Sequence, residues 1–232
     1  MLEVEGLETR YGAAQILFGV SFTVEKGRAA CLVGRNGVGK STTLRSIMGL
    51  TPPAAGSIRF EGTEIAGLPP FRIARLGLGY VPEDRRIFAD LTVEENLQIA
   101  ERPSEGGIEW SIEKAYEMFP PLAEFRRRQG GYLSGGQQQM LTIARTLMGA
   151  PRLLLLDEPT EGLSPLVIRD LEEAILKLKA EGLTMLLAAQ DLRFAHNVAD
   201  DVYVMNRGEI VWGGAIEAAR AASGEVAAHL AV

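Results

Sequence analysis

A glycine-rich run that ends in lysine and serine is the part of this sequence best suited to chemistry. Residues 34–41 match the phosphate-loop pattern G-x-x-x-x-G-K-[ST] without mismatch. The eight residues are Gly34, Arg35, Asn36, Gly37, Val38, Gly39, Lys40 and Ser41. Glycines let successive backbone N–H groups converge on a phosphate, and the positive N-terminal end of a following helix attracts the negative charge of that phosphate. Lys40 is then placed to reach the β- and γ-phosphates, the Ser41 hydroxyl to bind Mg²⁺, and Thr42 to bond a further phosphate oxygen. The pattern predicts a nucleotide-phosphate site.

Two adjacent carboxylates form a second chemical centre. Asp157 and Glu158 directly follow the apolar run 153–156, which is typical of a buried strand. Ligands of open α/β sheets bind at the carboxyl ends of the strands, so both side chains are expected at the site. We expect Asp157 to hold Mg²⁺, directly or through water, and Glu158 to polarise the attacking water as general base.

The elements that must position these residues alternate between strand and helix. Short β-rich runs precede the glycine-rich loop at 2–5, 16–24 and 28–33, and 41–50 has the apolar spacing of a helix. Beyond the two carboxylates the pattern predicts a helix at 165–181, a strand at 183–189, a hairpin over 201–212 and a peripheral helix from 215. This alternation is typical of an α/β fold with a mostly parallel sheet.

The middle of the chain reads differently, because it is charged and helical and has no long apolar strand. Thr92 with Glu95 fits a capping box, Pro120 ends a helix at 110–119, and Ser134 is the expected N-cap of a third helix. Arg145 is expected on a solvated face of that third helix. We therefore expect one domain over 1–232, with a helical subdomain at about 84–149 inserted in the α/β core.

Composition narrows the function classes. Lys and Arg number 24 against 30 Asp and Glu, and the net charge of −6 disfavours a protein that wraps nucleic acid. Cys31 is the single cysteine, which excludes an intramolecular disulfide and a thiolate metal cluster. No run of about 20 apolar residues predicts a membrane span. The N-terminus also lacks the layout of a signal peptide, so we expect a cytoplasmic chain.

A further motif narrows the family. A run of five residues ends twenty positions before Asp157: Leu133, Ser134, Gly135, Gly136 and Gln137. With the other motifs, this run makes the chain resemble the ATP-binding subunits of ABC transporters over essentially its whole length. The resemblance implies a P-loop NTPase (RecA-like) fold with a mostly parallel sheet, an N-terminal antiparallel β subdomain and the inserted helical subdomain. It also implies that residues 134–137 bind the γ-phosphate of ATP held by the other subunit, that Tyr11 stacks on adenine, and that residues 160–165 touch the partner.

Two positions depart from the general family pattern and indicate a subfamily. Glu83 stands where most members carry Gln, and Gln190 stands where most carry a switch His. Glu83 can still contact Mg²⁺ or water, and Gln190 can donate to a γ-phosphate but cannot become cationic, which leaves the hydrolysis rate open. Together with the sequence at 81–97, these departures make the chain similar to the second ATPase of branched-chain amino acid importers. The urea importer subunit is similar too.

The resemblance implies an ATPase that powers uptake. It would pair head to tail with a second ATP-binding subunit, a paralogue or another copy of itself, and would drive two separate permease chains. A periplasmic solute-binding protein would take part indirectly, and the ATPase would lie on the inner face of the membrane through its permeases. The same role in a urea or amide importer and a non-transport ABC ATPase are the alternatives. Ser134 lies only 93 residues after Ser41, too close for the long coiled coil of DNA-repair members.

Overall fold

Two β-sheets form the framework of the molecule. The computed structural model describes residues 1–104, 106, 108–222 and 224. One sheet has four strands in the order β2-β1-β4-β5, and the other has six in the order β10-β9-β3-β8-β7-β6. The strands are β1 (Leu2–Tyr11), β2 (Ala14–Val24), β3 (Ala29–Val33), β4 (Ala55–Phe60), β5 (Thr63–Glu64), β6 (Leu78–Val81), β7 (Leu153–Asp157), β8 (Thr184–Ala189), β9 (Asp201–Asn206) and β10 (Glu209–Ala215).

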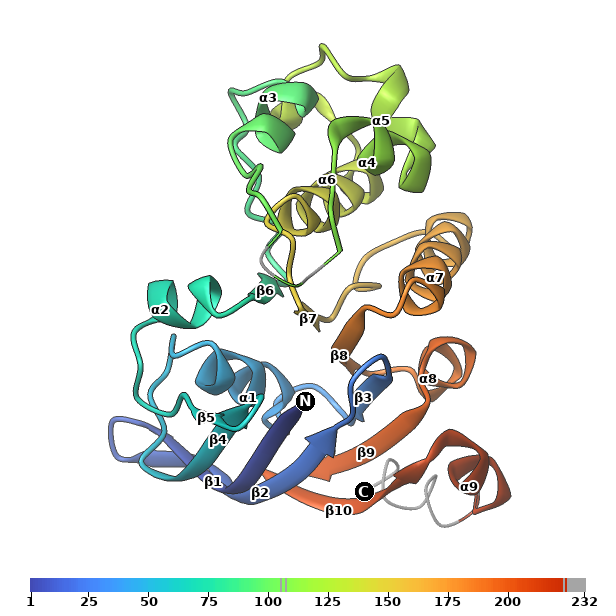
Figure 1. Ribbon diagram of the computed structural model, residues 1–232. Helices are drawn as coiled ribbons and strands as arrows, with labels where there is room; N and C mark the ends of the chain where they lie inside the picture. Colours follow the sequence, from blue (N-terminus) through green and yellow to red (C-terminus); the bar gives the residue numbers. More distant parts are fainter. Residues whose placement is uncertain (105, 107, 223, 225–232) are drawn as a thin grey trace.

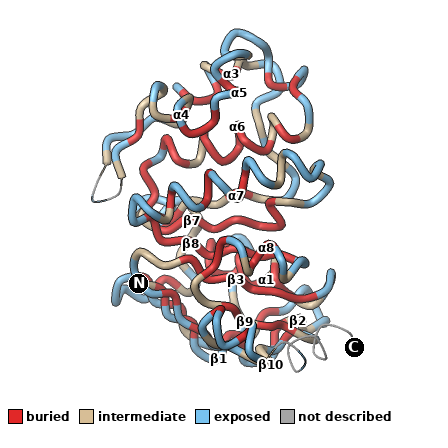
Figure 2. The backbone as a smooth tube through the Cα atoms, turned by 90° about the vertical axis from the view of Figure 1, so that its right-hand side faces the viewer, coloured by how far each residue is buried: buried red, intermediate tan, exposed pale blue. Residues whose placement is uncertain are grey.

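The six-stranded sheet is parallel except at one edge. Strand β3 pairs in parallel with β8 and β9, β7 pairs in parallel with β6 and β8, and β10 runs antiparallel to β9. Strands β3, β7 and β8 are buried along their whole length, as the red tube of Figure 2 shows. Their successive side chains enter two different hydrophobic cores: Leu154 and Leu156 pack on one face, and Leu153 and Leu155 on the other. Burial on both faces explains why these strands read as unbroken apolar runs.

The helices complete a layered arrangement. They are α1 (Lys40–Ile47), α2 (Pro70–Arg75), α3 (Val93–Gln98), α4 (Ile112–Met118), α5 (Pro120–Glu124), α6 (Gly135–Leu147), α7 (Pro165–Ala180), α8 (Leu192–Val198) and α9 (Ile216–Ala221), with a 3₁₀ turn η1 (Gly130–Tyr132). Helix α1 packs in the core shared by the two sheets, whereas α7 and α8 pack on the opposite face of the six-stranded sheet. Helix α1 therefore lies between the sheets and begins at the edge where the strands end.

The described residues between β6 and β7 form helices and connecting loops, with one isolated bridge between Thr92 and Gln129. Helices α3 to α6 gather at one end of the molecule, and the four-stranded sheet lies at the other (Figure 1). Thr92 and Glu95 form the expected capping box at α3. Pro120 ends α4 as expected and also begins α5, because its fixed φ and missing N–H suit the first position of a helix.

The expected fold class is confirmed, but the segment 54–81 was not assigned from its sequence. It contains β4, β5, α2 and β6, which are short and are interrupted by glycines and prolines. Strand β4 exists because it pairs with β1, and β6 exists because it pairs with β7. Such distant pairing leaves little local pattern. None of the helices within the described ranges has the length and apolar character needed to cross a bilayer.

The burial of β7 on both faces leads to a prediction about stability. Leu155 is fully buried and Leu166 on α7 is 61% exposed. We expect Leu155→Ala to lower the free energy of unfolding by about 2–5 kcal/mol, because a cavity is left beside α1. Leu166→Ala, the matched control, should change it by less than about 0.5 kcal/mol. Urea unfolding followed by circular dichroism measures both; similar losses for the two variants would contradict the assigned burial.

Candidate active site

The phosphate loop joins the end of β3 to the start of α1. Its conformation requires glycine at defined positions: Gly37 and Gly39 have φ of 83° and 111°, in the left-handed region. Gly34 needs glycine for a different reason, because a Cβ there would lie 2.5 Å from the carbonyl oxygen of Met205. The backbone N–H of Gly208 also donates to the carbonyl of Val38 at 2.9 Å. The turn between β9 and β10 thus packs against the phosphate loop and supports its conformation.

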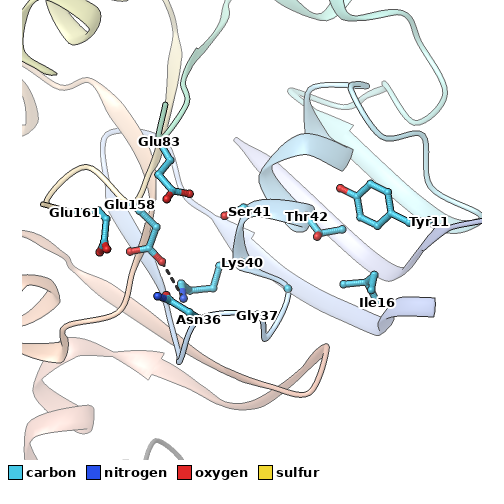
Figure 3. Close-up of a pocket in the computed structure, with 11 residues that line it drawn as sticks. Tyr11, Ile16, Asn36, Gly37, Lys40, Ser41, Thr42, Glu83, Glu158 and Glu161 are labelled. Carbon is cyan, nitrogen blue, oxygen red and sulfur yellow. Dashed lines mark ion pairs between the residues drawn. The ribbon is translucent and has the colours of Figure 1, made fainter. Parts of the chain in front are cut away.

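Lys40 and Glu158 form a buried ion pair at the centre of the site. The Lys40 Nζ lies 2.9 Å from Glu158 Oε1, and the two side chains are only 3% and 8% exposed. Lys40 also donates to the carbonyls of Gly34 at 2.6 Å and Arg35 at 3.0 Å, so its ammonium group has three acceptors. The dashed line in Figure 3 marks the ion pair.

The environment of Glu158 favours its acting as a proton acceptor. Burial raises the pKa of the Glu158 carboxyl above its ordinary value, and the hydrogen bond and charge of Lys40 oppose that rise. A raised pKa makes a carboxylate a stronger base near neutral pH. Glu158 also has a φ of 45°, an uncommon conformation for a residue with a side chain. Backbone strain of this kind is concentrated at functional sites.

A chain of hydrogen bonds orients Asp157. The Ser41 hydroxyl donates to Asp157 Oδ1 at 2.7 Å, and the Tyr80 hydroxyl donates to Oδ2 at 2.9 Å. Burial and the negative charge of Asp157 raise the pKa of Tyr80, so its hydroxyl stays protonated and remains a donor. Sequence reasoning missed Tyr80. The available signal was its place on β6, whose carboxyl end lies beside that of β7 in a parallel pair.

The oxygen atoms of Ser41 and Asp157 fit a magnesium ion. Mg²⁺ prefers hard oxygen ligands and is usually bound through one or two carboxylates together with substrate phosphates and water. Within the described ranges, no group of three or more His, Cys, Asp or Glu side chains is arranged to hold a metal by itself. The donor set therefore suits an ion that arrives with phosphates, rather than one enclosed by protein ligands alone.

One cavity of about 440 Å³ brings half of the predicted site residues together, and Gly34, Arg35, Val38 and Asp157 lie just outside its lining. Its lining consists of Tyr11, Ile16, Asn36, Gly37, Gly39, Lys40, Ser41, Thr42, Glu83, Glu158 and Glu161. Figure 3 shows Tyr11 and Ile16 at one end, the carboxylates at the other, and Lys40, Ser41 and Thr42 between them. An apolar end, a cationic centre and an acidic end match the base, the phosphates and the water-activating group that nucleotide hydrolysis requires.

Several predicted residues lie elsewhere. Ser134, Gly135, Gly136 and Gln137 begin α6 and do not line the cavity. Ser134 is the N-cap as expected, and it forms a capping box with Gln137 that the sequence analysis did not identify. Gln190 directly follows β8, is exposed, and does not line the cavity either.

Arg145 corrects one expectation, because it does not lie on a solvated helix face. Burial lowers the pKa of its guanidinium, which donates to the carbonyl of Arg86. The same guanidinium lies 4.9 Å from the ring centroid of Phe88. Asn96 also holds this loop by accepting from the N–H of Phe88 at 2.9 Å and donating to its carbonyl at 2.9 Å. Helices α3 and α6 together fix the loop that follows Glu83.

Comparisons with known proteins place these features in a family. The family described as ABC transporter matches residues 17–161. The chain is 44% identical over 212 residues to the high-affinity branched-chain amino acid transport ATP-binding protein BraG of Pseudomonas aeruginosa, covering 91% of both chains. It is 39% identical to the probable branched-chain amino acid transport ATP-binding protein LivF of Archaeoglobus fulgidus, covering 92% of both.

Solved structures agree with the sequence relatives. An ATP-binding subunit of an ABC transporter matches with a TM-score of 0.82 at 30% identity and covers 100% of both chains. The ADP conformation of an ATP-binding cassette of an ABC transporter also matches with a TM-score of 0.82 at 30% identity, covering 99% of this chain and 97% of that one. The phosphate loop and Glu158 line one cavity, and Asp157 is hydrogen-bonded to Ser41 in that lining. Together with these likenesses, the site shows that the chain belongs to the ABC transporter family and is an ATPase.

Proposed function

We propose that this chain is the ATP-hydrolysing subunit of an importer of branched-chain amino acids, and that it works with separate permease chains. One observation carries the proposal. The phosphate loop and Glu158 line one cavity, and Asp157 accepts a hydrogen bond from Ser41 in that lining, in a chain that is 44% identical over 91% of its length to a protein named for branched-chain amino acid transport. We take residues 1–232 as one ATPase domain in which the segment at about 84–149 is a helical subdomain.

Phosphate binding begins with an exchange of partners at Lys40. Its ammonium group donates to two loop carbonyls and pairs with Glu158, and the β- and γ-phosphates of ATP offer stronger acceptors at the same place. The N–H groups of Gly34 and Val38 already donate to the carbonyls of Ala189 and Arg35, so the other backbone N–H groups of the loop and the start of α1 complete the phosphate cradle. Once Lys40 turns to the phosphates, Glu158 is released from its partner and becomes available as a base.

Ser41 and Asp157 are the proposed metal-binding pair, and Glu83 provides a third oxygen donor at the acidic end of the cavity. The 2.7 Å hydrogen bond between Ser41 and Asp157 supports this assignment, because it holds both oxygens at one point. Mg²⁺, when bound, supplies charge neutralisation for the phosphates. The Tyr80 hydroxyl keeps Asp157 oriented from the side away from Ser41.

Glu158 is the proposed general base, and Gln190 the proposed sensor of the γ-phosphate. A base must reach the proton it removes, and Glu158 lies at the cavity wall beside Lys40. Gln190 follows β8, whose last residue Ala189 accepts a hydrogen bond from the N–H of Gly34 at 3.4 Å. That link supports a position for Gln190 close to the phosphate loop. Tyr11, at the opposite end of the cavity, is the proposed adenine platform.

A second ATP-binding subunit completes each site. Residues 134–137 are exposed or half-buried except Gly136, and they lie outside the cavity of their own chain. The N-terminus of the 13-residue helix α6 attracts anions, so it suits the γ-phosphate of ATP held by another subunit. We propose that two subunits pair head to tail, with the loop 160–165 at their contact. The partner is a paralogue or a second copy of this chain.

The loop after Glu83 is the proposed contact for the permeases. Phe88 is 50% exposed, while its backbone is fixed by Asn96 and its ring is covered on one side by Arg145. An exposed aromatic side chain on a braced loop is suited to a protein interface. Two permease chains would bind here and hold the ATPase on the inner face of the cell membrane. A periplasmic solute-binding protein would act on the permeases from the other side.

Glu158 provides the sharpest test of the chemistry. We expect Glu158→Gln to lower the steady-state rate of phosphate release by at least about 100-fold, because a general base contributes roughly 10²–10⁴. Nucleotide affinity should not fall, since Lys40 loses a competing partner. Glu173→Gln, on the exposed face of α7, is the control. Equal rates for wild type and Glu158→Gln would exclude the proposed base.

Tyr80 tests the metal site. We expect Tyr80→Phe to raise the Mg²⁺ concentration needed for half-maximal nucleotide binding by about tenfold, because Asp157 loses an orienting donor. Binding of a fluorescent ATP analogue reads this out without turnover. Tyr203→Phe is matched, since its hydroxyl also makes a hydrogen bond, at 2.8 Å to the carbonyl of Thr23, but away from the cavity. A similar Mg²⁺ requirement in both variants would contradict the assigned role of Tyr80.

Uptake in cells tests the transport role. We expect deletion of the gene in its host to abolish high-affinity uptake of radiolabelled leucine and valine, and the wild-type gene to restore it. A gene encoding Glu158→Gln should not restore uptake, which separates hydrolysis from assembly. Loss of urea uptake with leucine uptake retained would overturn the proposed solute and leave the ATPase assignment standing.

A further inference from the structure

Arg85 lies against two functional segments that are far from it in the sequence. Its Nη2 donates to the carbonyl of Glu161 at 2.7 Å. The guanidinium also lies close to Gly135 at the start of α6, since a Cβ there would lie 2.6 Å from Arg85 Nη1. A Cβ on Gly162 would lie 3.6 Å from Nη2. The guanidinium of Arg85 therefore lies against both the loop 160–165 and the first turn of α6. The backbone of Arg85 belongs to the segment 82–92 between β6 and α3, here called the Glu83 loop.

The backbone at Arg85 is unfavourable for an arginine. Its φ is 48°, in the left-handed region that is unfavourable for a residue with a side chain. The turn is tight, since the N–H of Ile87 donates to the carbonyl of Arg85 at 2.6 Å. Glycine suits such a position better. The contacts of the Arg85 side chain therefore have to offset the unfavourable free energy of its backbone conformation.

The neighbouring Arg86 shows that the contacts of Arg85 are specific. Arg86 forms an ion pair with Asp84 at 2.8 Å, and the two side chains are 70% and 56% exposed. Among the ion pairs of the described residues, none includes Arg85. Its hydrogen bond to a carbonyl is charge-assisted, which makes it stronger than a neutral one. The two adjacent arginines therefore differ in role: one pairs at the surface, and the other joins separate loops.

The segment that Arg85 holds is directly connected to the catalytic centre. The N–H of Glu161 donates to the carbonyl of Glu158 at 3.1 Å, and the N–H of Leu163 donates to that of Thr160 at 3.2 Å. The turn after β7 is thus compact, and a displacement of the Glu161 carbonyl would take place close to Glu158. The same guanidinium lies beside Gly135, in the first turn of α6.

We infer that Arg85 is a positioning residue that couples the Glu83 loop to both segments proposed to face the second subunit, the loop 160–165 and the N-terminus of α6. The coupling part of this inference rests on the proposed function, in which the Glu83 loop is the contact for the permeases. A displacement of that loop then shifts the Glu161 carbonyl and the start of α6 together. Both halves of the subunit contact respond to one side chain.

The positioning contact is tested in the isolated full chain. We compare wild type with Arg85→Gly, which removes the guanidinium and suits the left-handed backbone, so that folding is preserved. Arg86→Ala is the matched control, and Arg85→Lys keeps the charge. In hydrogen exchange read by mass spectrometry, Arg85→Gly should exchange roughly tenfold faster over 159–163 and at the start of α6, because a charge-assisted hydrogen bond is lost. Arg86→Ala should match wild type, and Arg85→Lys should recover part of the protection. Unchanged exchange in Arg85→Gly, or an equal rise in Arg86→Ala, would overturn the inference.

The coupling is tested by ATP-driven association, measured by sedimentation in a Glu158→Gln background that blocks hydrolysis. Arg85→Gly should need about tenfold more protein to associate, while ATP affinity of the dilute monomer stays unchanged. If the Glu158→Gln chain associates and Arg85→Gly does not shift the midpoint, the coupling role is wrong. If the Glu158→Gln chain fails to associate with itself and with its paralogue, the proposed subunit pairing fails, and hydrogen exchange alone still decides the positioning contact.

Discussion

The parallel pairing of β3, β8, β7 and β6 is the constraint on which the rest of the structure depends. Because these strands run in one direction, their carboxyl ends share one edge of the sheet. The phosphate loop follows β3, Glu158 follows β7, Gln190 follows β8, and Glu83 follows β6 after one intervening residue. Residues separated by more than a hundred positions are thus brought together by strand direction alone. The apolar side chains that hold the strands on both faces are what make that alignment rigid.

The parts of the site that could be predicted from the sequence are those encoded in contiguous residues. The phosphate loop, the Asp157–Glu158 pair and the caps at Thr92 and Ser134 each depend on neighbours within a few positions, so their chemistry is legible in the chain. The strands β4 and β6 are set by pairing with the distant strands β1 and β7, and their short segments carry little periodicity. Local pattern therefore indicates the residues of the candidate site better than it indicates the scaffold around them.

The residues that sequence reasoning missed act through position rather than type. Tyr80 matters because the register of β6 against β7 places its hydroxyl at Asp157. Arg145 sits on an amphipathic helix where a solvated face was the simplest expectation, but the Phe88 loop folds over it. No composition or spacing rule distinguishes such residues from ordinary surface side chains. Tyr80 is recognised only when the strand register is known, and Arg145 only when the conformation of the Phe88 loop is known.

The turn between β9 and β10 has a consequence for how the chain can be altered. A hairpin tip at residues 206–208 is the kind of surface loop in which insertions and fused tags are usually tolerated. Here the N–H of Gly208 holds the carbonyl of Val38, its own carbonyl accepts from Phe18 at 2.9 Å, and a Cβ on Gly208 would lie 2.0 Å from the carbonyl oxygen of Ile16. The tip thus supports both the phosphate loop and the strand at the opposite end of the cavity. Lengthening it would disturb nucleotide binding from the outside, and a label or fusion is better carried by another loop.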